Sequence, residues 1–249
     1  MTTYSLYNGS VLLEFDEAKH VYLVKGEIVP SVTGIKAPNP ALQWWSANMA
    51  RDHILENLKP GIALDEIAIQ ELAEGARKAH SVISKKAASI GTLAHEACEV
   101  FARTGSVAKP PIHPQARASF ETFVKWWEDH DVKLHDAEKK VYSRNYGYAG
   151  TADLFCEVDG VRCIVDLKTS NAIYDDYFMQ LAAYAHARNE EMKHELRLED
   201  CLPYEDGWIV RLPKDGGPVE TRHCDRDGLS KAFGAFTGLL EYYTWAKSS

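Results

Sequence analysis

The chain has 249 residues, a hydrophobic content of 45% and a formal net charge of −8. This length suits one α/β domain, with or without an elaborated edge, and the composition provides enough apolar side chains for a core. The negative charge excludes a protein that is basic over its whole surface, so any contact with nucleic acid has to come from a local basic cluster.

No apolar run has the length of a transmembrane helix, and the first eight residues lack the features of a targeting segment. We therefore expect a cytoplasmic protein, of a bacterium or a phage-infected cell, without a membrane partner. The five cysteines are scattered and odd in number, which favours reduced and mostly buried thiols. Because no Cys-x-x-Cys pair occurs, we expect no iron–sulfur cluster.

The first third of the chain predicts a small sheet followed by helices. Residues 11–24 alternate and are rich in Val, Leu, Phe and Tyr, which indicates a hairpin that 27–29 can extend. The segment 30–34 is typical of a loop that starts a helix. In it, Ser31 and Thr33 can either bind a phosphate of DNA or cap the helix. Helices are predicted over 40–58, 63–74 and 76–103, with a bend at Gly91 as an option in the last.

A basic stretch without acidic residues lies between Glu74 and Glu96. Its basic side chains are Arg77, Lys78, Lys85 and Lys86. Such a stretch is either a solvated helix surface or a contact for the phosphate backbone of DNA. Its position directly before a histidine motif, described below, favours the DNA contact.

The remainder of the chain predicts a sheet with helices. Helices are expected over 114–130, 174–189 and 226–247, and strands over 133–143, 148–158, 161–168 and 207–212. The pairs Trp44-Trp45 and Trp126-Trp127 place neighbouring rings on different sides of a helix. We expect at least one ring of each pair in a core, while the other can stack on a nucleic-acid base.

The predicted central hairpin has the clearest chemical meaning. Asp159-Gly160 stands between two apolar, β-branched runs, which is the strongest short-range signal for a hairpin. Side chains of a strand alternate between its faces, so Asp166 and Lys168 share one face. By the same rule Asp153 shares a face with Phe155. One face of the hairpin can thus gather two carboxylates and an ammonium group.

This combination fits the hydrolysis of phosphodiester bonds. Two neighbouring carboxylates need a proton or a cation between them, and hard oxygen ligands suit Mg²⁺ or Mn²⁺. A lysine beside the metal can position or deprotonate water and offset the charge of a phosphate. The pattern acid-x-Lys alone carries no information, since it recurs at 131–133 and 191–193. The strand, the turn and the following amphipathic helix distinguish 166–168.

Four short motifs in this order resemble the PD-(D/E)XK nucleases. They are Gly91-Thr-x-x-His95, Gly150-Thr-Ala-Asp153, Asp166-Leu-Lys168 and Gln180-x-x-x-Tyr184. The chain is most similar to the RecB-like branch with its phage and mitochondrial-type exonucleases, although Ala152 stands where the family name has proline. The resemblance implies an α/β, restriction-endonuclease-like fold, in which helices flank a mixed central sheet. We expect a single nuclease domain over 1–249, with an N-terminal β-hairpin and helical elaboration in 1–75 and the nuclease core in 76–249.

The same resemblance implies roles for individual residues. The implied metal ligands are His95, Asp153, Asp166 and the backbone carbonyl of Leu167, and the implied catalytic residues are Lys168, Asp153, Asp166, Gln180 and Tyr184. Relatives place an acidic residue near Glu138 that can reach the metal, but strand parity leaves its direction open. Tyr177 shares a helix face with Gln180 and Tyr184, so we expect it to contact DNA.

The expected activity is that of a Mg²⁺- or Mn²⁺-dependent exonuclease that cleaves DNA without sequence specificity, in recombination, repair or phage DNA processing. Its DNA would have a free end or be single-stranded, and a recombination or replication protein is a further partner that the sequence does not identify. Two alternatives stay open: a structure-selective endonuclease, and a noncatalytic DNA-binding or assembly module with a nuclease fold. The complete set of Asp153, Asp166 and Lys168 weighs against the noncatalytic module.

Overall fold

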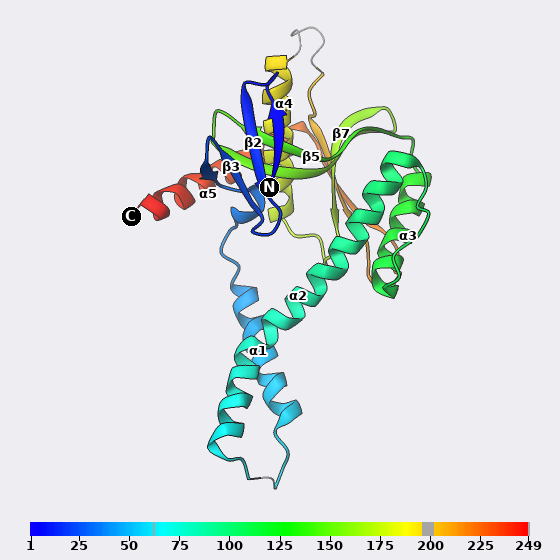
Figure 1. The fold of residues 1–249 in the computed structure, drawn as a ribbon. Helices are drawn as coiled ribbons and strands as arrows, with labels where there is room; N and C mark the ends of the chain where they lie inside the picture. The colour runs from blue at the N-terminus through cyan, green and yellow to red at the C-terminus, as the bar shows by residue number, and fades with distance from the viewer. Residues whose placement is uncertain (62, 196–201, 249) are drawn as a thin grey trace. The chain divides into compact units, whose positions relative to one another are not determined.

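The computed structural model describes residues 1–61, 63–195 and 202–248 and shows a mixed α/β protein (Figure 1). The chain divides into two compact units. The first unit comprises Met1–Lys36 and Ala94–Ser249, and the second comprises Ala37–Leu93.

Two sheets belong to the first unit. The antiparallel sheet has the order β1 (Thr2–Leu6), β2 (Val11–Asp16), β3 (Val21–Val24) and β4 (Glu27–Val29). The larger sheet has the order β5 (Val132–Ser143), β6 (Tyr148–Val158), β7 (Val161–Lys168), β8 (Asp206–Arg211) and β9 (Glu220–Cys224). Its neighbours pair antiparallel except β7 and β8, which are parallel. A parallel pair requires a crossover connection, and a helix supplies it here.

Helices cover both faces of the larger sheet. The helical elements are η1 (Val32–Gly34), α1 (Pro40–Asn57), α2 (Glu66–Thr104), α3 (Pro114–Glu128), α4 (Asp176–Glu195) and α5 (Arg226–Ser248). On one face, Leu181 of α4 and Phe236 of α5 pack against Ile164. On the other face, Phe123 of α3 joins a cluster with Val165 and with the last turns of α2. The predicted fold class, a mixed central sheet flanked by helices with an N-terminal β-hairpin region, is confirmed.

The division into units differs from the expected partition at residues 75 and 76. The N-terminal sheet packs with the larger sheet, since the Tyr7 hydroxyl donates to the Tyr142 carbonyl at 2.9 Å. Ala149 of β6 lies in the same apolar cluster as the N-terminal strands. Residues 1–36 therefore belong with the core, and the helical residues that follow form a unit of their own.

One predicted helix boundary is wrong. The helices expected over 63–74 and 76–103 are a single helix, α2, which passes through Gly75. A Cβ atom at Gly75 would lie 2.3 Å from Nε2 of His53 on α1. Glycine here serves the close approach of two helices within the second unit rather than a helix end. Strands β1 and β9 were not predicted from the sequence.

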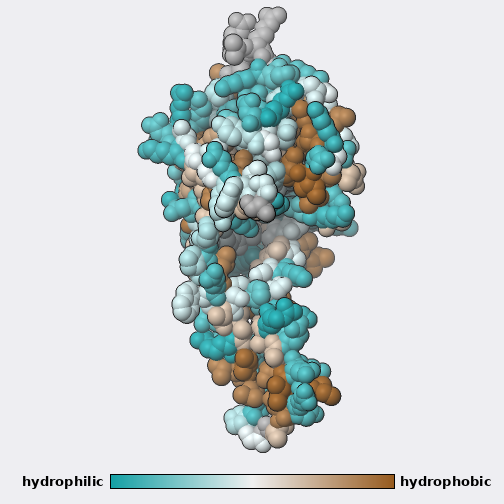
Figure 2. Space-filling model, turned by 90° about the vertical axis from the view of Figure 1, so that its left-hand side faces the viewer, coloured by the Kyte–Doolittle hydropathy of each residue, from teal (hydrophilic) through white to brown (hydrophobic). Residues whose placement is uncertain are grey.

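The two tryptophan pairs behave differently. Trp126 is buried, as expected for one ring of its pair. In α1 no residue is buried, and Trp44 is 75% exposed, so the expected core role of Trp44 or Trp45 is wrong. A unit of two helical segments offers α1 too few neighbours to cover an apolar face. Apolar side chains accordingly reach the surface of this unit (Figure 2).

Most of the described cysteines are buried free thiols, as expected from the sequence. Cys98, Cys156 and Cys163 are buried free thiols and Cys224 is partly exposed, whereas Cys201 lies outside the described residues. Membrane-spanning character is absent from the described helices, since none combines the required length with sufficient apolar side chains.

Candidate metal centre

The candidate site lies where β6 and β7 stop pairing. Their ladder runs from the turn to the pair Leu154↔Val165 and extends no further. Beyond this point the Leu167 backbone N–H donates to Asp153 Oδ2 at 2.6 Å. A side-chain carboxylate thus replaces a backbone acceptor, and this contact holds Asp153 beside β7.

Alternation along β6 is interrupted at the same level. Ala152 and Phe155 both belong to the core under α4 and α5, whereas Leu154 belongs to the core on the other face. Alternation therefore does not carry from Asp153 to Phe155, and the prediction that they share a face is wrong. The irregularity is local, because the strand has to part from β7 here.

Glu138 on β5 adopts an unusual backbone conformation. Its φ is +47°, in the left-handed region that costs a non-glycine residue roughly 1–2 kcal/mol. The pairs on either side of it place it opposite Asp153 across β5 and β6. One ligand atom from each of His95, Glu138 and Asp153 lies within 4.8 Å of the others. This convergence decides the direction that the sequence left open, and Glu138 joins the predicted ligands.

His95 reaches the cluster from α2. Its Nδ1 lies 3.5 Å from Asp153 Oδ1. Cys98 and Ala102, three and seven residues further on, are buried in the core against the sheet. This stripe of small side chains on one helix face brings the helix close to the sheet and turns His95 toward β6.

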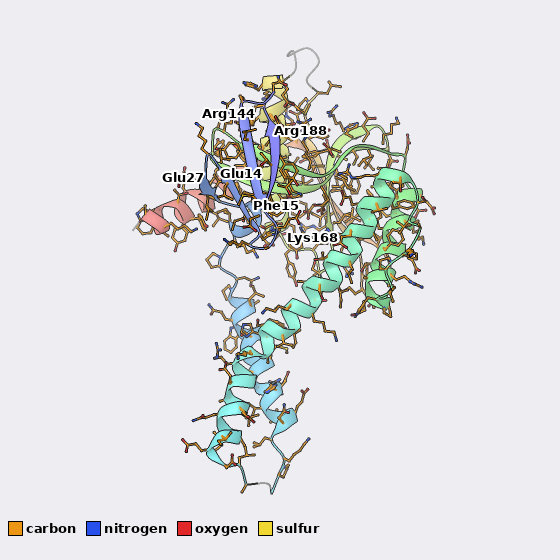
Figure 3. All side chains as sticks on the ribbon, viewed as in Figure 1. Glu14, Phe15, Glu27, Arg144, Lys168 and Arg188 are labelled. Atoms are coloured by element: carbon orange, nitrogen blue, oxygen red, sulfur yellow. The ribbon has the colours of Figure 1, made fainter. Side chains whose placement is uncertain are left out.

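Lys168, labelled in Figure 3, and Asp166 lie at the end of β7 and are not part of the cluster of His95, Glu138 and Asp153. Lys168 Nζ lies 2.6 Å from Asp166 Oδ2, as their shared face predicted. Asp166 is only 3% exposed. The contact is an ion pair without the angles of a hydrogen bond, and among the described groups Asp166 Oδ2 accepts no hydrogen bond. A buried anionic oxygen in this state fits the ligand of a hard cation.

Two residues of α4 border Lys168, and a third packs against β6. Gln180 Oε1 accepts a hydrogen bond from Lys168 Nζ at 3.4 Å, and the Tyr177 ring centroid lies 4.8 Å from Nζ. Tyr184 is buried, and a Cβ atom at Gly150 would lie 2.5 Å from its ring. The glycine of the motif that ends in Asp153 therefore makes room for the tyrosine of the helix motif. Tyr184 supports the site from the core side.

The N-terminal sheet supplies supporting residues that were not among the predicted site residues. The Tyr22 hydroxyl lies 2.7 Å from Thr151 Oγ1, two residues before Asp153. Lys140 Nζ donates to the Glu138 carbonyl at 3.4 Å and lies over the Phe15 ring. These contacts brace both strands at their irregular points. Their signal in the sequence is weak, because it depends on pairing between distant segments.

The site contains more carboxylates than cationic side chains. Burial raises the pKa of Asp166 to about 6, although Lys168 opposes it. Burial, reinforced by Asp153, raises the pKa of Glu138 to about 7. Burial also opposes ionisation of Asp153, but His95 and Lys168 outweigh it and hold its pKa below the usual range. A divalent cation would relieve this crowding.

These pKa values predict that metal affinity depends on pH. Above about pH 7 Glu138 and Asp166 are ionised, and as the pH falls through about 7 and about 6 each takes up a proton that competes with the cation. We expect the apparent affinity for Mn²⁺ to fall over this range, measured by calorimetry in buffers that report released protons. Glu138→Gln should weaken this pH dependence without removing it, because Asp166 and His95, whose pKa is also raised, still take up protons that compete with the cation. An affinity that is constant across the range would contradict the ligand set.

Comparison with known proteins adds little to this geometry. No protein-family model matches the chain, and no curated protein matches it. Among solved structures, a crystal structure of SSO0001 is similar over 81% of this chain and 86% of its own, with 13% identical residues and a TM-score of 0.34. So low a score supports no statement about fold or function, and the site rests on its own residues.

Of the two candidate phosphate contacts near η1, one has a structural partner. Ser31 Oγ accepts a hydrogen bond from the Gly34 backbone N–H at 3.1 Å, so capping accounts for it. Ser31 also bridges Ala149 of β6, which brings this segment to the larger sheet. Thr33 is exposed and stays a predicted DNA contact.

The basic stretch of α2 falls in the second unit and splits into two pairs. Arg77 and Lys78 are exposed and both lie 2.7 Å from Glu74, as in an ordinary solvated helix face. Lys85 and Lys86 are exposed, and the described residues include no ion-pair partner for either. Lys85 and Lys86 are therefore the better candidates for phosphate contacts.

Replacing Lys85 and Lys86 by glutamine is expected to weaken DNA binding and to lower the slope of log affinity against log salt by about one for each phosphate that the variant no longer binds. The measurement is a salt titration of binding to a short DNA. The charge-matched control is the double variant of Lys19 and Lys25, two exposed lysines of the N-terminal sheet. If both double variants had the same slope of log affinity against log salt, Lys85 and Lys86 would belong to an ordinary solvated helix surface and would not contact DNA.

Proposed function

We propose that this protein is a metal-dependent deoxyribonuclease that hydrolyses phosphodiester bonds. One observation carries the proposal: His95, Glu138 and Asp153 converge within 4.8 Å, near the buried Asp166 and its half-buried ion-pair partner Lys168. Oxygen-rich ligands with one imidazole suit Mg²⁺ or Mn²⁺, and an adjacent ammonium suits a phosphate.

The proposed site consists of metal ligands and one cationic side chain that would bind the phosphate. Asp153, Asp166, Glu138 and His95 would hold the metal ion, with the Leu167 carbonyl as a further oxygen. When bound, the ion supplies Lewis-acid activation of water and phosphate. Burial disfavours the charge of Lys168, but Asp166 and Asp153 outweigh it and raise its pKa. Lys168 therefore holds its proton in the protein alone, the form that anchors a phosphate.

The resemblance of the four motifs to RecB-like nucleases favours exonucleolytic cleavage without sequence specificity, in recombination, repair or phage DNA processing. The structure supports this assignment with the contacts among the motifs. Gln180 binds Lys168, Tyr184 packs on Gly150, and His95 contacts Asp153. Degenerate, noncatalytic modules would not be expected to retain all of these partners.

The test is a digestion time course in Mg²⁺ and in Mn²⁺ with end-labelled linear single-stranded, linear duplex and circular DNA. We expect linear substrates to shorten from their ends, circles to persist, and EDTA to stop the reaction. Cleavage of circles would assign an endonuclease instead. Binding without cleavage of any substrate in either metal would overturn the enzyme and leave the noncatalytic module.

A further inference from the structure

An exposed tyrosine ring stands beside the lysine of the proposed site. Tyr174 lies between β7 and α4 and is 46% exposed. Its ring meets the Tyr177 ring edge-on, with centroids 5.6 Å apart and an interplanar angle of 82°. The centroid of the Tyr177 ring lies 4.8 Å from Lys168 Nζ. Two aromatic rings thus lead from the lysine to the solvent.

The segment that carries Tyr174 is held from several sides. Arg211 of β8 donates to the Ser170 carbonyl at 3.4 Å. The Ser170 hydroxyl donates to the Ala172 carbonyl at 2.8 Å, and the Phe178 backbone N–H donates to the Asp175 carbonyl at 3.1 Å. The Tyr177 backbone N–H donates to the Tyr174 carbonyl at 3.2 Å. The ring is therefore presented from a fixed backbone, which lowers the entropy lost when it binds a ligand.

Two cationic side chains lie near this segment, which itself carries the carboxylates of Asp175 and Asp176. Lys168 lies by the Tyr177 ring, and Arg222 of β9 forms an ion pair at 3.0 Å with Asp175, whose side chain is 92% exposed. An ion pair this open contributes little, so Arg222 can exchange the carboxylate for a phosphate at small cost. Proteins hold single strands by combining aromatic rings with nearby cations that bind the phosphates.

We propose that Tyr174 is a stacking site for an unpaired nucleobase of the strand whose phosphate reaches Lys168. Exposure alone would not support this, since single exposed rings are common; the chain of contacts to Lys168 and the fixed backbone do. In a duplex both faces of a base are covered by its neighbours, so only an unpaired or terminal base can stack on a side chain. The inference rests on the proposed function and deepens it: the site selects single-stranded ends.

The test measures binding without cleavage. A short single-stranded oligonucleotide with 2-aminopurine at its end, and a covalently closed circular duplex that has no terminal base, are titrated with protein in Ca²⁺. For the single strand, Tyr174→Ala should lower the affinity about tenfold and remove the quenching of 2-aminopurine, whereas Tyr174→Phe should retain both. Duplex affinity should stay unchanged. Tyr242→Ala, which removes another exposed tyrosine on α5, is the matched control and should behave as the parent.

The inference would be overturned by any of three results. They are single-strand affinity and quenching in Tyr174→Ala equal to those of the parent, an equal loss of duplex affinity, or no binding of the single strand by the parent. Thermal unfolding of each variant verifies that the fold is retained, as expected for an exposed side chain. The measurement reports binding and does not require cleavage. A protein that binds DNA but does not cleave it would therefore contradict the nuclease proposal, while the role of Tyr174 in binding could still be tested.

Discussion

Replacing Lys168 by alanine or methionine is expected to slow DNA cleavage at least about a hundredfold, the low end for the loss of acid–base catalysis, while binding of metal and DNA persists. The ammonium lies 2.6 Å from Asp166 and borders the ligand cluster, where an attacked phosphate would gain charge. An interaction strengthened in the transition state acts on turnover more than on affinity. Metal binding persists because an ammonium is not a ligand, and its removal relieves repulsion with the cation.

The measurement combines single-turnover rates in Mn²⁺ with DNA binding in Ca²⁺. Lys133→Ala serves as the matched control, since Lys133 lies on β5 with an exposed side chain and forms only long ion pairs. If Lys168→Ala cleaved DNA at nearly the parent rate, the role of Lys168 would be structural, and the assignment of residues 166–168 as catalytic would be wrong.

Lys168→Arg separates two roles of the lysine. Arginine keeps the positive charge beside Asp166 but does not release its proton in proteins. If Lys168 only anchors the phosphate, Lys168→Arg should recover a substantial part of the rate lost in Lys168→Met. If it must give up a proton, both variants should be equally slow.

Asp153→Asn and Asp166→Asn are each expected to abolish Mg²⁺-dependent cleavage while the fold survives. Both carboxylates belong to the proposed ligand set, and an amide oxygen without charge would be a much weaker ligand for a divalent cation. Rates and Mn²⁺ binding are measured together, with Asp131→Asn, at an exposed carboxylate, as control. Substantial Mg²⁺-dependent activity in both site variants would contradict the assignment of Asp153 and Asp166 as metal ligands.

The two variants should differ in stability. Asp153 is stabilised when ionised, by His95 and by the hydrogen bond from the Leu167 N–H, so Asp153→Asn should lose about 2 kcal/mol and lower Tm by roughly 4–8 °C. Asp166 has a pKa raised to about 6, so its ionised form opposes folding at higher pH. At pH 8, Asp166→Asn should therefore unfold at a higher temperature than Asp153→Asn. The reverse order would contradict the charge distribution derived for the site.

Local signals determined the central hairpin. Its strands occupy the predicted ranges 148–158 and 161–168, and the turn residues Asp159 and Gly160 have φ values of +51° and +82°. Such a turn depends on residue type alone, because few residues tolerate positive φ at both positions. Alternation along β7 likewise sufficed to place Asp166 and Lys168 together, since they are neighbours on one regular strand.

Only the tertiary structure decided the rest of the site. The positive φ of Glu138 has no signal in its residue type, and it occurs on β5 opposite the point where β6 parts from β7. The same parting overturned the expected alternation at Asp153. The bracing by Tyr22 and the boundary of the units depend on contacts between segments far apart in the chain. Periodicity and turn chemistry describe short stretches, whereas the energy of such a site comes from packing and charge across strands.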